Sequence, residues 1–168
     1  MPDSHQLILL RHAKSDWHSD VGDARSDFDR PLSARGRRDA PRMGKWLADN
    51  GYAPDGVVAS PAQRAKQTVE LACAEMGFDA AGIIYERGLY HATVAEVEMV
   101  AVALLADYRR LLLVGHNPGL EYALRDYCPA AAAFDDGKLM PTCAAAVIEF
   151  PGGEARPRLL SHMRPALL

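Results

Sequence analysis

The sequence has no surplus of positive charge, few cysteines and no long apolar segment. Its 19 lysines and arginines stand against 22 aspartates and glutamates, which leaves a formal net charge of −3 at pH 7. Because binding to a nucleic-acid backbone usually needs a basic surplus, nucleic acid is not expected as a partner. No apolar run approaches the ~20 residues that a membrane-spanning helix needs, and no signal-type leader precedes the first apolar segment. We therefore expect a cytoplasmic protein without a membrane partner.

The number and spacing of the cysteines argue against a disulfide-rich protein and against a zinc-binding protein. Cys73, Cys128 and Cys143 are odd in number, far apart and without a C-x-x-C pair, so neither a disulfide framework nor a zinc site is indicated. We expect them to be small buried hydrophobic residues in a reducing compartment. The sequence also has no H-E-x-x-H motif and no tight cluster of histidine and aspartate. No metal and no other cofactor is therefore predicted.

The pattern of apolar residues predicts the fold class. At 168 residues with 49% hydrophobic content, the chain is expected to form one domain over residues 1–168. Strand patterns alternate with helical patterns up to about residue 128, and a strand pair with a Pro-Gly-Gly turn follows. This order predicts a three-layer α/β/α sandwich with a mostly parallel sheet and an antiparallel C-terminal edge. The expected strands are 6–10, 56–59, 83–85, 110–114, 144–150 and 158–162, and the expected helices are 34–50, 61–76, 93–105 and 119–127.

Cationic and titratable side chains follow three of the predicted parallel strands. Arg11 and His12 end the first strand, and Arg64 lies one turn into the helix after the second. His116 follows the fourth strand. Since the carboxyl ends of parallel strands share one edge, where open α/β sheets bind ligands, we expect these four side chains to meet there. Residues 13–32, polar and acidic, are expected to form a loop over that edge.

This combination of groups is suited to phosphoryl chemistry. Two arginines can neutralise a phosphate dianion and bind its oxygens in bidentate fashion without a metal. A neutral imidazole in line with phosphorus can act as a nucleophile and form a covalent phosphohistidine. A second imidazole, if protonated, can donate to the equatorial oxygens of the transition state. The residues alone thus predict an anion site, most simply one for phosphate.

Four motifs resemble those of a known family. Leu9-Leu-Arg-His-Ala13, Arg30-Pro-Leu-Ser-Ala-Arg-Gly36, Ser60-Pro-Ala-Gln-Arg-Ala-Lys-Gln-Thr68 and Val114-Gly-His-Asn-Pro118 resemble, in order, the signatures of the histidine phosphatase superfamily, the phosphoglycerate-mutase-like proteins. With Pro141-Thr142 before an apolar strand, the chain is most similar to the short SixA-type phosphohistidine phosphatases. The resemblance covers about residues 6–150.

The resemblance implies a role for each matched residue. His12 would be the nucleophile, Arg11 and Arg64 would bind the phosphoryl group, and His116 would stabilise it in the transition state. Ser15 and Asn117 are further candidates for binding the phosphate oxygens, although they are equally suited to capping turns.

One position departs from the family pattern. Many members carry a general-acid glutamate after the third strand, in a form like L-x-E, whereas here Gly88-Leu-Tyr-His-Ala92 places His91 in that position. His91 is therefore the candidate general acid, and Glu86 is expected to be a solvated loop residue. A phosphoramidate has a leaving nitrogen that solvent protonates readily, whereas an alkoxide needs an acid. The altered acid thus favours phosphohistidine over an alkyl ester as substrate.

Three functions are carried forward. The first is a metal-independent phosphatase that acts on phosphohistidine in a protein, with a phosphorylated protein of the histidine-phosphotransfer type as partner. The second is a phosphomonoesterase or, with less support, a mutase for a small phosphorylated molecule. The third is a phosphate-binding module without turnover, against which the presence of all four site residues argues. We expect a monomer.

Overall fold

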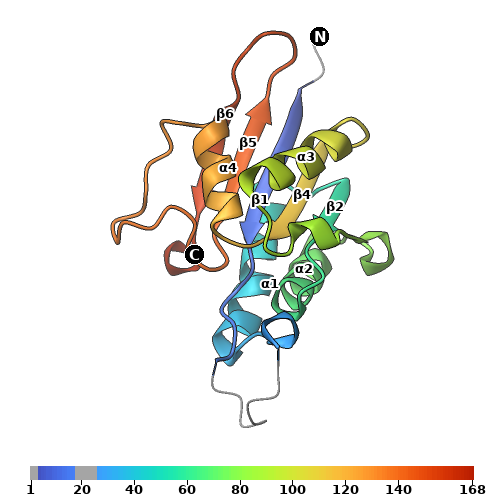
Figure 1. The fold of residues 1–168 in the computed structure, drawn as a ribbon, viewed down its shortest axis with the longest axis vertical. Helices are drawn as coiled ribbons and strands as arrows, with labels where there is room; N and C mark the ends of the chain where they lie inside the picture. Colours follow the sequence, from blue (N-terminus) through green and yellow to red (C-terminus); the bar gives the residue numbers. More distant parts are fainter. Residues whose placement is uncertain (1–3, 18–25) are drawn as a thin grey trace.

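A computed structural model describes residues 4–17 and 26–168, which contain a six-stranded sheet with the order β3-β2-β4-β1-β5-β6. The strands are β1 (His5–Arg11), β2 (Gly56–Ala59), β3 (Ile84–Tyr85), β4 (Arg110–Gly115), β5 (Ala145–Phe150) and β6 (Arg158–Met163). The α-helices in these residues are α1 (Ala34–Asp49), α2 (Gln63–Met76), α3 (Val94–Leu105) and α4 (Gly119–Tyr127). The alternation of strands and helices confirms the predicted α/β fold (Figure 1).

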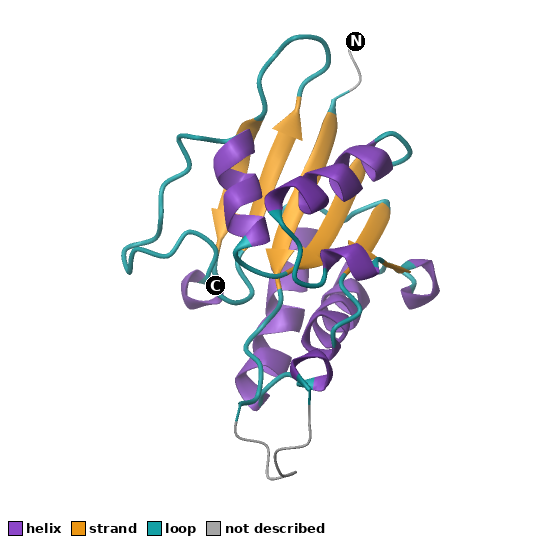
Figure 2. Cartoon of the chain, viewed as in Figure 1, coloured by secondary structure: helices purple, strands orange, loops and turns teal. Residues whose placement is uncertain are grey.

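β1 is the strand that ends at Arg11, just before His12. It pairs in parallel with β4 and antiparallel with β5. β2 pairs in parallel with both β4 and β3, while β6 pairs antiparallel with β5. Figure 2 shows the arrows of β1 and β5 pointing in opposite directions. The four parallel strands therefore end at one edge of the sheet, and the antiparallel edge predicted for the C-terminal strands is confirmed.

Helices cover both faces of the sheet. Ile8 and Leu10 of β1 belong to a buried cluster with α1 and α2, whereas Leu7 and Leu9 belong to a cluster with α3 and α4. Figure 1 shows α3 and α4 in front of the strands. Because side chains alternate between the two faces of a strand, a strand covered on both faces must be apolar throughout. This is why β1 reads as an uninterrupted aliphatic run.

Helix ends follow local signals in the sequence. The hydroxyl of Ser33 accepts a hydrogen bond from the Gly36 N–H at the start of α1. Thr93 and Glu96 form a capping box at the start of α3. Gly77 ends α2 in the left-handed region with φ +70°. These caps confirm the predicted starts of α1 and α3 and the predicted end of α2.

The start of α2 differs from the prediction. Pro61 was expected in the first turn, but α2 begins at Gln63, and Ala62 before it is extended with ψ 139°. The Ala62 N–H donates to the Ser60 hydroxyl at 3.3 Å, which turns the chain before the helix starts. The prediction that Pro61 lies in the first turn is therefore wrong.

The loops contain short 3-10 helices that the sequence did not reveal. Residues 18–25 of the predicted loop 13–32 lie outside the described residues, and η1 (Asp27–Asp29) follows them. The others are η2 (Ala80–Gly82), η3 (Arg87–Leu89) and η4 (Pro165–Leu167). Among the described residues, no helix is long and apolar enough to cross a membrane.

Candidate active site

A cavity of about 300 Å³ opens at the edge where the parallel strands end. Three separate strand ends contribute to it: β1 through Arg11 and His12, β2 and α2 through Arg64, and β4 through His116. The structure thus brings together the four residues that the sequence singled out. The other lining residues are Lys14, Ser15, Trp17, Asp27, Arg30, His91, Asn117 and Thr142.

His12 is held by its backbone and by one ring nitrogen. Its N–H donates to the Gly115 carbonyl at 3.0 Å, and its carbonyl accepts from the Cys143 N–H at 3.0 Å. Its Nδ1 lies 2.7 Å from the Ala13 carbonyl. Because a carbonyl only accepts, this contact assigns the proton to Nδ1 and leaves Nε2 with a free lone pair. One ring nitrogen of His12 is thus left without a proton, as the role predicted from the sequence requires.

The surroundings of His12 keep its ring neutral. Its side chain is buried, and burial lowers the pKa of His12 well below its ordinary value. The hydrogen bond to Ala13 opposes this, while the neighbouring His116, Arg11 and Arg64 lower the pKa further. Neutral imidazole is the form that can attack phosphorus.

His116 lies beside His12, with ring centroids 5.1 Å apart. Burial, followed by the charge of Arg64, lowers the pKa of His116 to about 3. Its Nε2 is 2.7 Å from the Ser60 hydroxyl, and that hydroxyl already accepts from the Ala62 N–H. A hydroxyl has one proton to donate and two lone pairs, so the contacts alone do not fix the direction. We assign Ser60 as the donor to Nε2 and the ring proton of His116 to Nδ1, because this tautomer presents an N–H to a bound oxyanion.

The charge of the His116 ring differs from the one expected from the sequence. The sequence suggests a protonated imidazole as the donor, but with a pKa of about 3 the ring of His116 is neutral at pH 7. Nδ1 is buried and has no partner among the described residues. A neutral His116 can still donate its Nδ1 proton to an oxyanion, because Ser60 satisfies the other nitrogen.

Arg64 is buried and bound to the loop that follows β1 in sequence. Its Nη1 donates to the Asp27 carbonyl at 2.7 Å, and its Nη2 donates to Asp27 Oδ2 at 3.1 Å. Its own carbonyl accepts from the Thr68 hydroxyl at 2.7 Å, and the same hydroxyl accepts from the Ala13 N–H. Thr68 thus connects α2 to Ala13, the residue after His12.

Arg11 faces the cavity from the end of β1. Its Nη1 donates to the Met140 carbonyl at 3.1 Å, while its Nε is buried without a partner among the described residues. Burial lowers the pKa of Arg11, and the nearby Glu121 partly offsets this. Arg11 and Arg64 therefore bring two guanidinium groups to one cavity.

Asp27 is the cavity residue that sequence reasoning missed. Its carboxylate accepts hydrogen bonds from the Tyr90 hydroxyl at 2.7 Å and from Arg30 at 2.6 Å as well as from Arg64. Burial alone would raise the pKa of Asp27, but these donors outweigh it and hold the pKa well below its ordinary value. Asp27 is therefore ionised and orients Arg64. Nothing in the sequence distinguished it from the other acids of that loop.

Ser15 and Asn117 both line the cavity but already have protein partners. The Ser15 hydroxyl accepts from Arg30 Nε at 3.0 Å, and Asn117 Nδ2 donates to the Met140 carbonyl at 2.9 Å. Their role in binding phosphate stays a prediction. Glu86 accepts from the Gly88 N–H at the start of η3, which is a structural contact.

His91 lies at the mouth of the cavity with 71% of its side chain exposed. Its backbone is in the left-handed region, with φ 56°, and its ring stacks on Tyr90 with centroids 3.9 Å apart. Its Nε2 is 3.9 Å from Asp27 Oδ2. The imidazole of His91 therefore lies beside the site but is exposed to solvent.

The side chains that line the cavity include several hydrogen-bond donors with positive charge, which suit an anion as ligand. Within the described residues, no group of three or more histidine, cysteine, aspartate or glutamate side chains is arranged to hold a metal ion. The three cysteines are buried and free, and none lines the cavity.

Comparisons with known proteins agree with this geometry. The family model described as histidine phosphatase superfamily (branch 1) matches residues 7–102. An uncharacterised protein of Mycobacterium tuberculosis is 36% identical over 148 residues, which are 85% of this chain and 88% of that protein. Two similar solved structures are assigned as the phosphohistidine phosphatase SixA. The one from Agrobacterium tumefaciens is 29% identical with a TM-score of 0.77, covering 96% of this chain and 98% of that chain. The one from Nakamurella multipartitia is 31% identical with a TM-score of 0.73, covering 98% and 99%.

Proposed function

The chain belongs to the histidine phosphatase superfamily and is a phosphatase with a catalytic histidine, and from this premise we propose that it hydrolyses phosphohistidine in a protein through a covalent intermediate on His12. The observation that carries the proposal is the neutral His12 ring, whose Nδ1 is bound to Ala13 and whose Nε2 is free. The SixA assignment of two similar structures supports the choice of substrate.

The reaction has two steps. His12 Nε2 attacks phosphorus, so a new N–P bond forms while the N–P bond of the substrate breaks and the leaving imidazole takes up a proton. Water then attacks the phosphorylated His12, which releases inorganic phosphate and restores the neutral ring. Arg11 and Arg64 bind the non-bridging oxygens in both steps, and the Nδ1 proton of His116 adds a donor as negative charge develops.

The acids around the cavity support phosphohistidine over an ester. Of the cavity residues within 4–17 and 26–168, Asp27 is the one carboxylate, and its three donors keep it ionised, so it has no proton to give. His91 is then the candidate acid, and it is exposed rather than buried. A nitrogen leaving group accepts a proton from solvent, whereas an alkoxide depends on a positioned acid.

Substrate preference tests this proposal directly. With EDTA present, we expect kcat/KM for a phosphohistidine-bearing peptide or phosphotransfer domain to exceed that for phenyl phosphate by at least about tenfold, which corresponds to ~1.4 kcal/mol of transition-state binding. Release of inorganic phosphate measures both reactions. A preference for the ester would favour a small-molecule phosphomonoesterase instead.

The role of His91 has its own prediction. Replacing His91 with glutamine should lower kcat for phenyl phosphate by about 10²-fold, the lower end of the usual range for losing one proton donor, and lower kcat for phosphohistidine much less. The pH profile of each reaction, measured for the wild type and the variant, checks the assignment. If both profiles are unchanged, His91 takes no part in proton transfer.

A further inference from the structure

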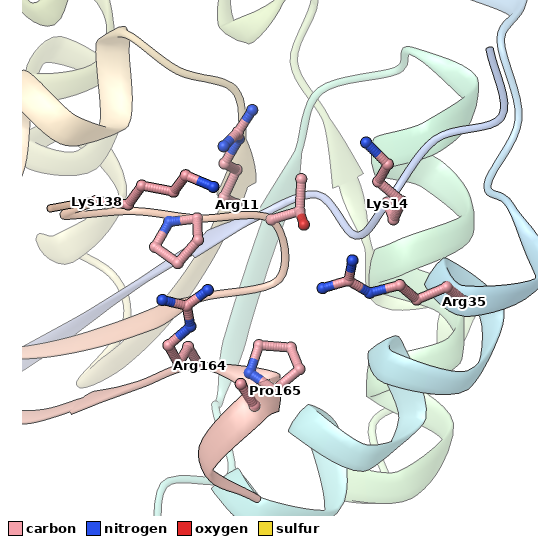
Figure 3. Close-up of a pocket in the computed structure, with 9 residues that line it drawn as sticks. Arg11, Lys14, Arg35, Lys138, Arg164 and Pro165 are labelled. Atoms are coloured by element: carbon pink, nitrogen blue, oxygen red, sulfur yellow. The ribbon is translucent and has the colours of Figure 1, made fainter. Parts of the chain in front are cut away.

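A second cavity, of about 270 Å³, lies next to the catalytic cavity. It is formed by the end of β1, the start of α1, the irregular segment before β5 and the C-terminal segment around η4. Figure 3 shows the side chains of Arg35, Lys138 and Arg164 extending toward the space between these segments, while the ends of Arg11 and Lys14 point toward the top of the view. Five basic residues line this space, namely Arg11, Lys14, Arg35, Lys138 and Arg164.

Among the residues that the structure describes, no carboxylate lines this cavity. Two acids contact the basic residues from outside: Asp136 lies 2.9 Å from Arg164 and 3.7 Å from Lys138, and Asp39 lies 3.4 Å from Arg35. Asp39 also pairs with Arg38 and Arg42, so its charge is shared among three guanidinium groups. A net positive charge therefore remains in the cavity, and the mutual repulsion of its basic groups favours an anion there.

Two of the guanidinium groups are fixed in place but incompletely satisfied. Arg164 stacks over the Phe134 ring with its Cζ 5.2 Å from the ring centroid, and it pairs with Asp136. The Nε atoms of Arg11 and Arg164 are buried and have no partner among the described residues. Unpaired buried donors are costly, and an oxyanion is the group that guanidinium nitrogens bind best.

The second cavity adjoins the catalytic one. Arg11, Lys14 and Thr142 line both cavities. The Lys14 carbonyl accepts from the Ser33 N–H at 2.9 Å and from the Ser33 hydroxyl at 3.1 Å, and the absence of a Cβ at Gly36 lets α1 approach that carbonyl. The shared wall is thus held in place by α1. Anionic groups bound in the two cavities would therefore be separated by the side chains of Arg11, Lys14 and Thr142.

We propose that this cavity binds a second oxyanion, a phosphate or carboxylate, of the same substrate molecule that delivers its phosphoryl group to His12. The inference rests on the proposed function, because it assigns to that substrate a second anionic group near the phosphoryl group. The cavity is small and lined by polar and basic groups rather than aromatic rings, which suits a compact anion.

Binding of non-hydrolysable probes tests the site without turnover. Methylphosphonate presents one phosphonate, and a series of bisphosphonates with one to four methylene groups presents two. By titration calorimetry, we expect at least one bisphosphonate to bind the wild type about tenfold more tightly than methylphosphonate. In the double variant Arg35→Gln, Lys138→Gln this advantage should fall to about twofold or less. Both side chains are mostly exposed, at 55% and 66%, so the variant should fold.

A matched variant controls for net charge. Arg38→Gln, Lys45→Gln removes the same charge from side chains that are 64% and 66% exposed and line neither cavity. It should keep the tenfold advantage. The proposal is overturned if no bisphosphonate binds more tightly than methylphosphonate, or if both double variants lose the advantage equally.

Measurements of turnover distinguish two sources of the second anion, a carboxylate of a protein substrate and a group of a small molecule. If it is a protein carboxylate, kcat/KM for a phosphohistidine peptide should fall when glutamate beside the phosphohistidine is changed to glutamine, and the Arg35→Gln, Lys138→Gln variant should lose this discrimination. If it is a small molecule, a bisphosphorylated substrate should show the same behaviour against its monophosphate. The bisphosphonate titration needs no phosphohistidine chemistry, so it can fail or succeed independently of the proposed function.

Discussion

Replacing His12 with alanine is expected to lower kcat for phosphohistidine by at least about 10³-fold and to abolish the covalent adduct. In the wild type, rapid quenching into alkali followed by mass spectrometry should find an acid-labile phosphoryl group on the peptide that contains His12. The physical reason is that Nε2 of His12 is the nitrogen held free by the Ala13 contact. The arginines and His116 remain in the variant, but binding alone forms no N–P bond.

A histidine on the same strand provides the control. His5 begins β1, at the end of the strand opposite the cavity, and its Nδ1 contacts the Tyr108 carbonyl. The His5→Ala variant should retain wild-type kcat and the adduct. Turnover of His12→Ala within tenfold of the wild type, or an adduct that forms on His116 instead, would contradict the assignment of the nucleophile.

Acid is expected to destabilise the protein in the pH range where histidines titrate. Burial lowers the pKa of His12, His116 and His162 in the folded state, so the unfolded chain binds more protons below its histidine pKa of about 6.5. The free energy of unfolding is then highest above pH 6.5 and falls as the pH decreases toward the folded-state values. For His116 this window extends to about pH 3. Each such histidine contributes a slope of up to ~1.4 kcal/mol per pH unit.

Urea unfolding at pH 7.5, 6.0, 5.0 and 4.5 measures this slope. The variant His116→Gln should show a flatter dependence of unfolding free energy on pH, because one buried group that must charge has been removed. Ser60 can hydrogen-bond to the glutamine amide, which limits the loss of stability at pH 7.5. Equal slopes for the wild type and the variant would mean that His116 does not titrate differently in the two states.

The fold was predictable because each element carries its own local signal. The buried parallel strands are short aliphatic runs, and Ser33, Gly77 and the Thr93–Glu96 pair act at helix ends as their chemistry predicts. Four positions, Arg11, His12, Arg64 and His116, were expected to meet because three strand ends share one edge, and they line one cavity. Both inferences use rules that depend on nearby residues and on sheet geometry.

Other parts of the site depend on long-range contacts that leave no pattern in the sequence. Asp27 is one of several acids in the same loop, and only its contacts with Arg30, Arg64 and Tyr90 make it distinct. Residues 129–142 have neither a helical nor a strand periodicity, yet the Met140 carbonyl in that segment accepts from both Arg11 and Asn117. Irregular backbone is placed by the rest of the fold, so its contacts cannot be inferred from periodicity.

The position of β1 also has a consequence for how activity is acquired. The cavity needs the ends of β1, β2 and β4, which are far apart in the chain and are joined only when the sheet pairs form. Closing such long loops is the slow part of assembling a parallel sheet. Recovery of turnover after dilution from denaturant should therefore lag behind the recovery of helical signal. For the same reason, the amide hydrogens of Leu7–Leu10 should exchange with solvent only through global unfolding, which makes the strand that ends at the nucleophile the most persistent part of the native state.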